Sequence, residues 1–217
     1  MKAIIVKSLK DIFSKEVILF VIKIGFASFT LSVLFIWFFW GGLSSFVASY
    51  LSWIPWEWLQ TSGSKIITFV MGYMIFVIMV SLLTSLYSER LLIRLAKKHY
   101  PSRAVVGSAD INGSLFVTLK SSLIFLFLFV LFIPFLFIPF IGQVVMLYLW
   151  SILLKEPTIY DVGSLFIENK KALKTQSKNT TLLAMVASLF NYIPVMNIFA
   201  PIFAQIMFLH KILGSKV

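Results

Sequence analysis

The chain has 217 residues, of which 60% are hydrophobic and 12% are charged, whereas an ordinary soluble domain has roughly 45–50% apolar and about 25% charged residues. With 23 Phe, 6 Trp and 7 Tyr, this composition excludes a soluble globule, because a core of that size cannot shield so many aromatic side chains from water. It predicts an all-α integral membrane protein with a single membrane domain over residues 1–217. The net charge of +11 would suggest nucleic acid as the partner of a soluble chain, but in a membrane protein it records topology. We therefore expect no nucleic-acid partner.

The side chains present exclude several kinds of site. The chain has no cysteine, so disulfides, thiolate metal sites and cysteine nucleophiles are absent. Its two histidines, His99 and His210, lie far apart in the sequence, and neither belongs to an HxxxH or HExxH motif. No nucleophile and base occur at a catalytic spacing, and no acidic residue lies inside the long apolar stretches. We expect no enzymatic activity, no metal, no cofactor and no relay of buried carboxylates.

In chain order, the first three predicted elements are a surface helix and two membrane crossings. Residues 1–15 combine lysines with apolar residues at helical spacing and predict an interfacial amphipathic helix. Residues 17–40 predict a transmembrane helix that ends at Gly41-Gly42, followed by a tryptophan-rich loop at the membrane interface. Residues 66–100 predict a second transmembrane helix, with a basic cytoplasmic extension that Pro101 stops.

Residues 121–154 and 179–209 are apolar stretches of awkward length. One crossing needs about 20 helical residues, and two crossings with a turn need roughly 45. Prolines interrupt both stretches near their centres, at Pro134, Pro139, Pro194 and Pro201. Since proline removes a backbone donor and disfavours helix in the residue before it, we predict two re-entrant, hemi-penetrating helical hairpins. The alternative is that the prolines only kink two long tilted crossings.

The positions of the basic residues favour hairpins over kinked crossings. Between the two predicted crossings, residues 41–65 contain one basic residue, Lys65, and the others lie in the N-terminal segment, in residues 89–120 and 155–178, and in the C-terminal tail. Because cytoplasmic loops attract Lys and Arg, those regions and both termini are predicted to be cytoplasmic. A kinked crossing in place of either hairpin would put a basic region outside.

A basic face is predicted on the extension of the second crossing. Its members recur at helical spacing and are Arg90, Arg94, Lys97 and Lys98. One interpretation is a topology anchor that also binds anionic lipid headgroups. The other is a funnel for an anionic solute.

A candidate anion path is predicted from the few polar residues in the hairpins. Gly142 and Gln143 follow the break at Pro139, while Asn191 and Asn197 surround Pro194. Broken helices in a membrane leave free backbone N–H groups at the start of their second arms, and such ends bind anions. Amide side chains add donors without placing a full charge in lipid. Alternatively, Asn191 and Asn197 cap their own turns.

Three segments carry a family resemblance. Residues 137–143 read FIPFIGQ, residues 191–201 read NYIPVMNIFAP, and residues 85–91 read SLYSERL, with Trp150 in the apolar run after the first segment. They resemble the CysZ-type sulfate permeases, which belong to a superfamily with etoposide-induced, autophagy-related membrane proteins. The resemblance implies a multi-pass protein of the bacterial inner membrane with two long transmembrane helices and two hemi-penetrating hairpins. It also implies homo-oligomers, without an ATPase, that take up sulfate for cysteine synthesis.

The chain departs from the family at the start of its first crossing. The family often carries a Gly-x-Arg-Arg element there that is associated with sulfate binding, but residues 16–20 read EVILF. Lys15 and Lys23 are the nearest charges that could replace it. We therefore carry two hypotheses: a permease for sulfate or a related oxyanion, and a non-transporting interaction protein that binds anionic lipid or a cytoplasmic partner through the basic face.

Overall fold

A computed structural model describes residues 2–52, 57, 59–136, 138–168, 173, 175, 180–193 and 195–214. Within these ranges the chain is helical and contains no strand. The elements are α1 (Lys2–Ile12), α2 (Lys15–Leu51), the π-helical η1 (Leu59–Gly63), α3 (Ser64–Tyr87), α4 (Glu89–His99), α5 (Ile111–Leu136), α6 (Ile141–Phe166), α8 (Thr180–Ser188), the 3₁₀-helices η2 (Leu189–Tyr192) and η3 (Met196–Phe199), and α9 (Ala200–Gly214). The predicted tryptophan-rich loop, with Trp53, Trp56 and Trp58, and the predicted break at Pro194 lie outside the described residues.

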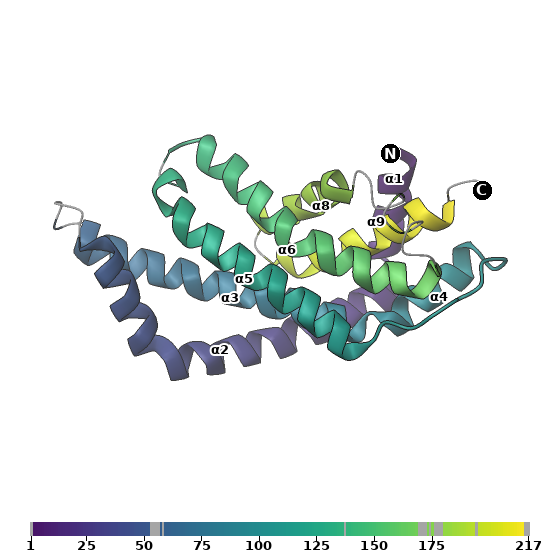
Figure 1. The fold of residues 1–217 in the computed structure, drawn as a ribbon, viewed down its shortest axis with the longest axis horizontal. Coiled ribbons are helices and arrows are strands. Elements are labelled where there is room, and N and C mark those ends of the chain that lie inside the picture. Colours follow the sequence, from purple (N-terminus) through teal and green to yellow (C-terminus); the bar gives the residue numbers. More distant parts are fainter. Residues whose placement is uncertain are drawn as a thin grey trace.

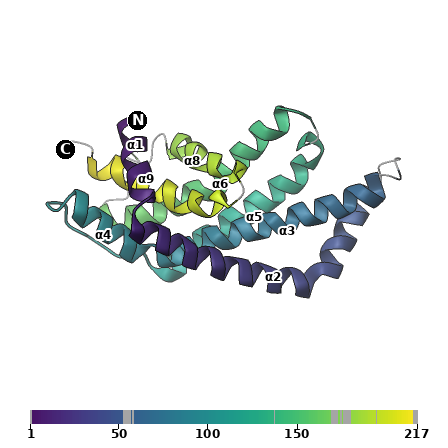
Figure 2. The same cartoon turned by 180° about the vertical axis from the view of Figure 1, so that it is seen from behind.

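The molecule is elongated, with α2 and α3 running antiparallel along its length (Figure 1). Both termini and the connection from α4 to α5 lie at one end, and the C-terminal end of α2 and the N-terminal end of α3 lie at the other (Figure 1). Seen from behind, α2 forms one long side of the molecule, and α1 and α9 pack together at the end that holds the termini (Figure 2). This arrangement places the α2–α3 pair beside helices α5, α6 and α9.

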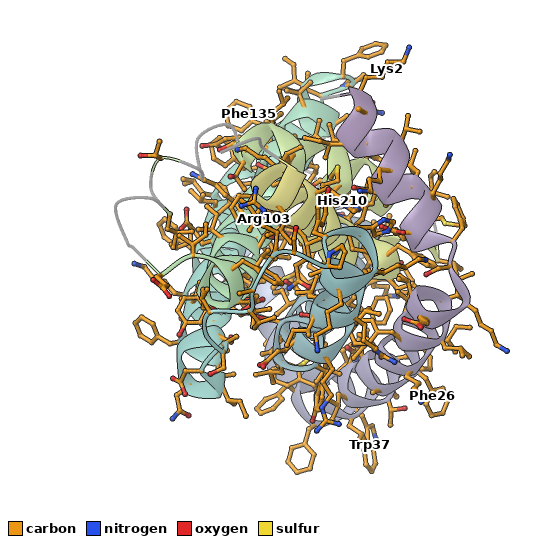
Figure 3. All side chains as sticks on the ribbon, turned by 90° about the vertical axis from the view of Figure 1, so that its right-hand side faces the viewer. Lys2, Phe26, Trp37, Arg103, Phe135 and His210 are labelled. Carbon is orange, nitrogen blue, oxygen red and sulfur yellow. The ribbon has the colours of Figure 1, made fainter. Side chains whose placement is uncertain are left out.

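Among the residues that the structure describes, four segments are long and apolar enough to cross a membrane: Lys15–Leu51, Ser64–Tyr87, Ile111–Leu136 and Met196–Gly214. The first and third are only 33% buried within the chain, and they expose large apolar side chains such as Phe26, Trp37 and Phe127. Figure 3 shows Phe26 and Trp37 pointing away from the body of the molecule. An exposed apolar surface of this extent is stable only in lipid, so the chain is a multi-pass membrane protein.

Helix α2 does not end at Gly41-Gly42, as the sequence predicted, but continues to Leu51. Glycine inside a helix costs only about 1 kcal/mol relative to alanine, and neither glycine has a positive φ. The helix is nevertheless bent (Figure 1). Ser44 donates a hydrogen bond to the carbonyl oxygens of Trp40 and Gly41, and glycine–serine combinations of this kind are typical sites of helix bending.

The second predicted helix, residues 66–100, is divided at Ser88 into α3 and α4. The division is local, because Ser88 keeps helical backbone angles, with φ of −76° and ψ of −18°. The Ser88 N–H donates to the Thr84 carbonyl, and the Leu92 N–H donates to the Ser88 carbonyl. Helix α4 ends at His99, before Pro101, as predicted.

The stretch 121–154 lies within a helical hairpin, α5 and α6, whose arms are longer than predicted. Each arm has 26 residues, which corresponds to about 39 Å of helix, because polar residues at both ends continue the helices. Pro139 lies in the turn, as predicted, but Pro134 lies inside α5. Proline at position 134 leaves the Val130 carbonyl without its usual helical donor. The Tyr50 hydroxyl of α2 donates to that carbonyl at 3.1 Å, so the helix tolerates this proline.

Gly142 allows the two arms to meet at this turn. A Cβ atom there would lie 2.8 Å from the Leu136 carbonyl oxygen and 2.9 Å from the Leu136 Cα atom. These are backbone atoms that cannot move aside, so a larger residue would push the start of α6 away from the end of α5. Gly142 is therefore a structural requirement of the hairpin.

The stretch 179–209 also folds back on itself. Helix α8 and η2 form the first arm, and η3 and α9 form the second. The sequence predicted a break at Pro201, but the structure shows none there. Pro201 is the second residue of α9, where a helix tolerates the missing N–H group. Helix α9 lies at the centre of the larger apolar core, and 78% of its candidate span is buried. The tip of this hairpin is therefore joined to a helix that is packed in the core.

Candidate functional site

A cavity of about 660 Å³ lies between α2, α3 and the tip of the second hairpin. Most of its lining is apolar, from Ile22 to Trp40 on α2 and from Phe69 to Phe76 on α3. Four polar side chains interrupt that lining: Ser32, Thr68, Tyr73 and Asn197. The space is large enough for a small solute, and its few polar groups determine which solute it could hold.

The Tyr73 hydroxyl joins α3 to the hairpin tip. It accepts a hydrogen bond from Nδ2 of Asn197 at 3.1 Å and donates to the backbone carbonyl of Asn191 at 3.3 Å. Asn191 and Asn197 are both buried. Among the described residues, Oδ1 of Asn191 and the hydroxyl of Ser32 are buried without a hydrogen-bond partner. The cavity lining therefore includes one hydroxyl, that of Ser32, without a hydrogen-bond partner, and Asn191 has an unpartnered amide oxygen outside the lining.

The two hairpin tips meet through Tyr192. Its hydroxyl donates to the backbone carbonyl of Gln143, and its ring packs edge-on against Trp150 at 4.9 Å between centroids. Of the four predicted anion-path residues, Asn197 lines the cavity, and Asn191 reaches Tyr73 through its carbonyl. Gly142 is buried at the turn, and the Gln143 side chain is exposed. These two residues support the tip and are not part of the described cavity lining.

The predicted basic residues lie on exposed surfaces. On α4, Arg90, Arg94, Lys97 and Lys98 are exposed, opposite a face that buries Leu91, Leu92 and Leu95. Lys15 and Lys23 are exposed on α2 and do not belong to the described lining of the large cavity. The four α4 residues therefore lie on an exposed surface, and the two α2 lysines are exposed outside the described lining of the large cavity.

Arg90 also lines a second cavity, of about 490 Å³, between the end of α3 and the start of α5. Its other polar side chains include Glu89, Ser85 and Ser114. Ser85 and Ser114 are themselves buried and lead from this cavity to a carboxylate in α6. The second cavity thus connects a cationic surface residue with the interior.

That carboxylate is Asp161, which is 2% exposed. Its Oδ2 atom accepts hydrogen bonds from the Ser85 hydroxyl at 2.6 Å and from Nε2 of Gln205 at 2.8 Å, and its Oδ1 atom accepts one from Ser114 at 2.9 Å. Thr118 donates to the Ser85 hydroxyl at 3.1 Å. One carboxylate therefore ties together α3, α5, α6 and α9.

Burial raises the pKa of Asp161 to about 6, although the three hydrogen bonds partly oppose the shift. Asp161 lies in α6, outside the four candidate spans. Asp161 was not predicted from the sequence as a site residue, because it follows the apolar stretch 121–154 in a polar region. A helical period continued beyond Leu154 would have found it, since Leu154, Thr158, Asp161 and Leu165 lie on one buried face of α6.

A second buried carboxylate, Asp11 of α1, lies between the two histidines. Nε2 of His99 is 2.7 Å from Oδ1 of Asp11, and Nε2 of His210 is 2.8 Å from Oδ2. The two histidines lie far apart in the sequence and outside any metal-binding motif, which predicted no metal site, but α4 and α9 bring both to the same carboxylate. Burial acts to raise the pKa of Asp11, but the hydrogen bonds from His210 and His99 outweigh it and lower that pKa below its usual value. Asp11 is therefore ionised at neutral pH.

Comparison with known families agrees with this architecture. Residues 4–201 match the model of the family described as sulfate transporter CysZ/etoposide-induced protein 2.4. The match covers most of the chain and includes both hairpin tips, which confirms the resemblance seen in the sequence. No match was found among curated proteins or among solved structures. The chain belongs to the CysZ/etoposide-induced protein 2.4 family.

Proposed function

We propose that this member of the CysZ/etoposide-induced protein 2.4 family is a permease for sulfate or a related oxyanion, and not an enzyme. The observation that carries the proposal is the hydrogen-bonded pair of Tyr73 and Asn197 at the wall of the large cavity, which the Asn191 carbonyl joins from behind the lining. It lies where two membrane-embedded hairpins meet. The family match supports sulfate as the first solute to test.

The chemistry of the cluster suits an anion that sheds part of its water. A dehydrated oxyanion needs several hydrogen-bond donors around it. The second N–H of the Asn197 amide and the unpartnered hydroxyl of Ser32 can supply donors in the cavity lining. The Tyr73 hydroxyl accepts from Asn197 and so holds that amide in position. No lysine or arginine belongs to the described lining. An anion held by dipoles alone can be released again, which a path for transport requires.

We place the basic face at the cytoplasmic mouth of this path. Arg90, Arg94, Lys97 and Lys98 are exposed on one helix, so they raise the local concentration of anions and also bind anionic lipid headgroups. Arg90 extends this positive potential into the second cavity. Lys15 and Lys23 remain further candidates for attracting anions at the surface of α2.

For the topology, we propose that both termini and the basic connections are cytoplasmic in a bacterial inner membrane, and that the chain forms homo-oligomers. Both termini lie at the same end of the molecule as the α4–α5 connection (Figure 1). In this arrangement both hairpins enter the membrane and return to the cytoplasmic side. The positive-inside rule supports this orientation, because Lys65 is the single basic residue of residues 41–65.

Single cysteines test the topology cleanly, because the chain has none of its own. We expect Ser62→Cys to react with a membrane-impermeant maleimide added to intact cells, and Ser108→Cys and Glu168→Cys to react only after the cells are opened. All three positions are exposed, so differences in labelling report sidedness. External labelling of Glu168→Cys would show that α5 and α6 do not return to the side on which they began.

The function itself is tested by uptake of labelled sulfate in cells that lack other sulfate importers. We expect expression of the chain to raise the initial rate of uptake well above that of an empty vector, and proteoliposomes of the purified protein to show the same flux. Arg90→Gln with Arg94→Gln should lower the flux most at low ionic strength, where exposed charges are least screened. If verified membrane expression gives no uptake of sulfate, and the proteoliposomes conduct no oxyanion, the permease proposal is wrong.

A further inference from the structure

Asp11, His99 and His210 form a compact cluster of three side chains at the end of the molecule that holds both termini. Their ligand atoms all lie within 4.8 Å of one another. The two imidazole rings are 5.2 Å apart and nearly perpendicular, at 76°, so they do not stack, and their Nε2 edges converge on Asp11. Figure 3 shows His210 inside the molecule rather than at its surface. The three residues come from α1, α4 and α9, which are rigid elements.

We propose that Asp11, His99 and His210 bind a divalent transition-metal ion, with Zn²⁺ as the best chemical match. Two imidazole nitrogens and one carboxylate are a ligand set that zinc takes in proteins, with an open position for water. Calcium and magnesium prefer sites made of oxygen atoms and fit these ligands poorly. Each carboxylate oxygen already faces one Nε2 atom, so an ion placed between them would meet ligands from all three helices.

Hydrogen bonds around the cluster hold His210 in position, as hydrogen bonds from neighbouring groups commonly do for metal-binding histidines. The Tyr100 hydroxyl lies 3.1 Å from Nδ1 of His210, which occupies one ring nitrogen and leaves Nε2 for the site. Lys7 donates to the same hydroxyl at 3.2 Å and lies 4.2 Å from the centre of the Tyr100 ring. Such hydrogen bonds hold the imidazole in position and favour one tautomer. His210 is therefore held with its metal-binding nitrogen toward Asp11.

The cluster of Asp11, His99 and His210 is buried on all but one side. A metal site with a water ligand needs one such open side. The side chains of Asp11 and His210 are 4% and 1% exposed, whereas that of His99 is 21% exposed. An ion can enter, and a water molecule can complete its coordination, beside His99. Coordination would replace the two hydrogen bonds to Asp11 and clamp the amphipathic α1 against α4 and α9. The site is separate from the proposed anion path, so it does not depend on the proposed function.

Metal titration of the full-length protein in detergent tests the proposal. After dialysis against a chelator, we expect one Zn²⁺ per chain by calorimetry and by metal analysis of the desalted protein. Each of Asp11→Asn, His99→Gln and His210→Gln should weaken binding on the order of 100-fold, since loss of a ligand costs at least as much as loss of an outer-shell partner. The matched control is Glu16→Gln, which removes an exposed carboxylate nearby and should bind as the wild type does.

Cobalt gives a readout that does not depend on variants that could misfold. Co²⁺ added to the wild type should produce the intense visible absorption bands of a four-coordinate site, and Zn²⁺ should abolish them. The proposal is overturned if the wild type binds less than a stoichiometric amount of either ion. It is also overturned if the three ligand variants, with gel-filtration profiles like that of the wild type, bind as tightly as Glu16→Gln does.

Discussion

The stability of this protein is expected to fall as pH rises from about 4 to about 6, and Asp161→Asn is expected to remove that component. The pKa of Asp161 is about 6 in the folded chain, against an ordinary value of 3.8 for an aspartate side chain. Between these values the folded state binds more protons than the unfolded state, so raising the pH favours unfolding. A difference of about 2 pKa units corresponds to roughly 3 kcal/mol. The loss should be complete above the folded pKa.

The measurement is the midpoint of thermal unfolding in detergent at a series of pH values for the wild type, Asp161→Asn and Glu168→Gln. The difference between the wild type and Asp161→Asn isolates Asp161 from other titrating groups. The contribution of Asp11 to stability has the opposite pH dependence, because its pKa is lowered in the folded chain. That contribution is lost as pH falls through the folded pKa of Asp11. Glu168 is exposed, so its removal should leave the pH profile unchanged. Parallel profiles for the wild type and Asp161→Asn would contradict the expected role of Asp161.

The position of Asp161 gives this titration a structural consequence. Its three donors come from α3, α5 and α9, and two of them, Ser85 and Ser114, line the cavity that contains Arg90. A change of charge at Asp161 therefore alters how four helices are held together and how the second cavity is charged. Buried ionisable groups in membrane proteins commonly mark functional positions for this reason.

Local chemistry was sufficient to predict several elements of the fold. The apolar composition predicted membrane-spanning helices, Pro101 predicted the end of α4, and Pro139 predicted the turn of the first hairpin. Each of these depends on neighbours in the sequence. The length of α5 could not be predicted in the same way, because Pro134 is accommodated by Tyr50 on a different helix. Nothing in the residues around position 134 indicates that distant donor.

The polar sites were predictable only in part. The motif at the second hairpin tip indicated Asn191 and Asn197, but their partner Tyr73 lies in an apolar run and carries no local signal. His99 and His210 meet only because α4 and α9 both pack near α1. Sequence spacing locates residues on one helix face, whereas these sites are built from side chains of three or four helices. A single sequence without the tertiary arrangement does not show which of its polar residues converge.

The largest functional effect is expected from removal of the Asn197 amide donor at the cavity wall, or of the Tyr73 hydroxyl that holds this amide in position. Tyr73→Phe deletes the hydroxyl that joins Asn197 to the Asn191 carbonyl, and Asn197→Leu replaces an amide with an apolar group of similar size. A hydrogen bond to a charged group contributes about 1.5–3 kcal/mol, and about 1.4 kcal/mol is a tenfold change. We therefore expect each variant to lower the initial rate of sulfate flux roughly 10- to 100-fold in proteoliposomes.

The control for these variants is Tyr148→Phe, which removes a tyrosine hydroxyl from an exposed position of α6 outside the described lining of both cavities. It should conduct as the wild type does when equal amounts of inserted protein are compared. The double variant Tyr73→Phe with Asn197→Leu is expected to lose less than the sum of the two single losses, because the two side chains share one hydrogen bond. Wild-type flux in both single variants would show that the anion path does not pass the hairpin tip. The cavity beside Arg90 would then be the remaining candidate for the path.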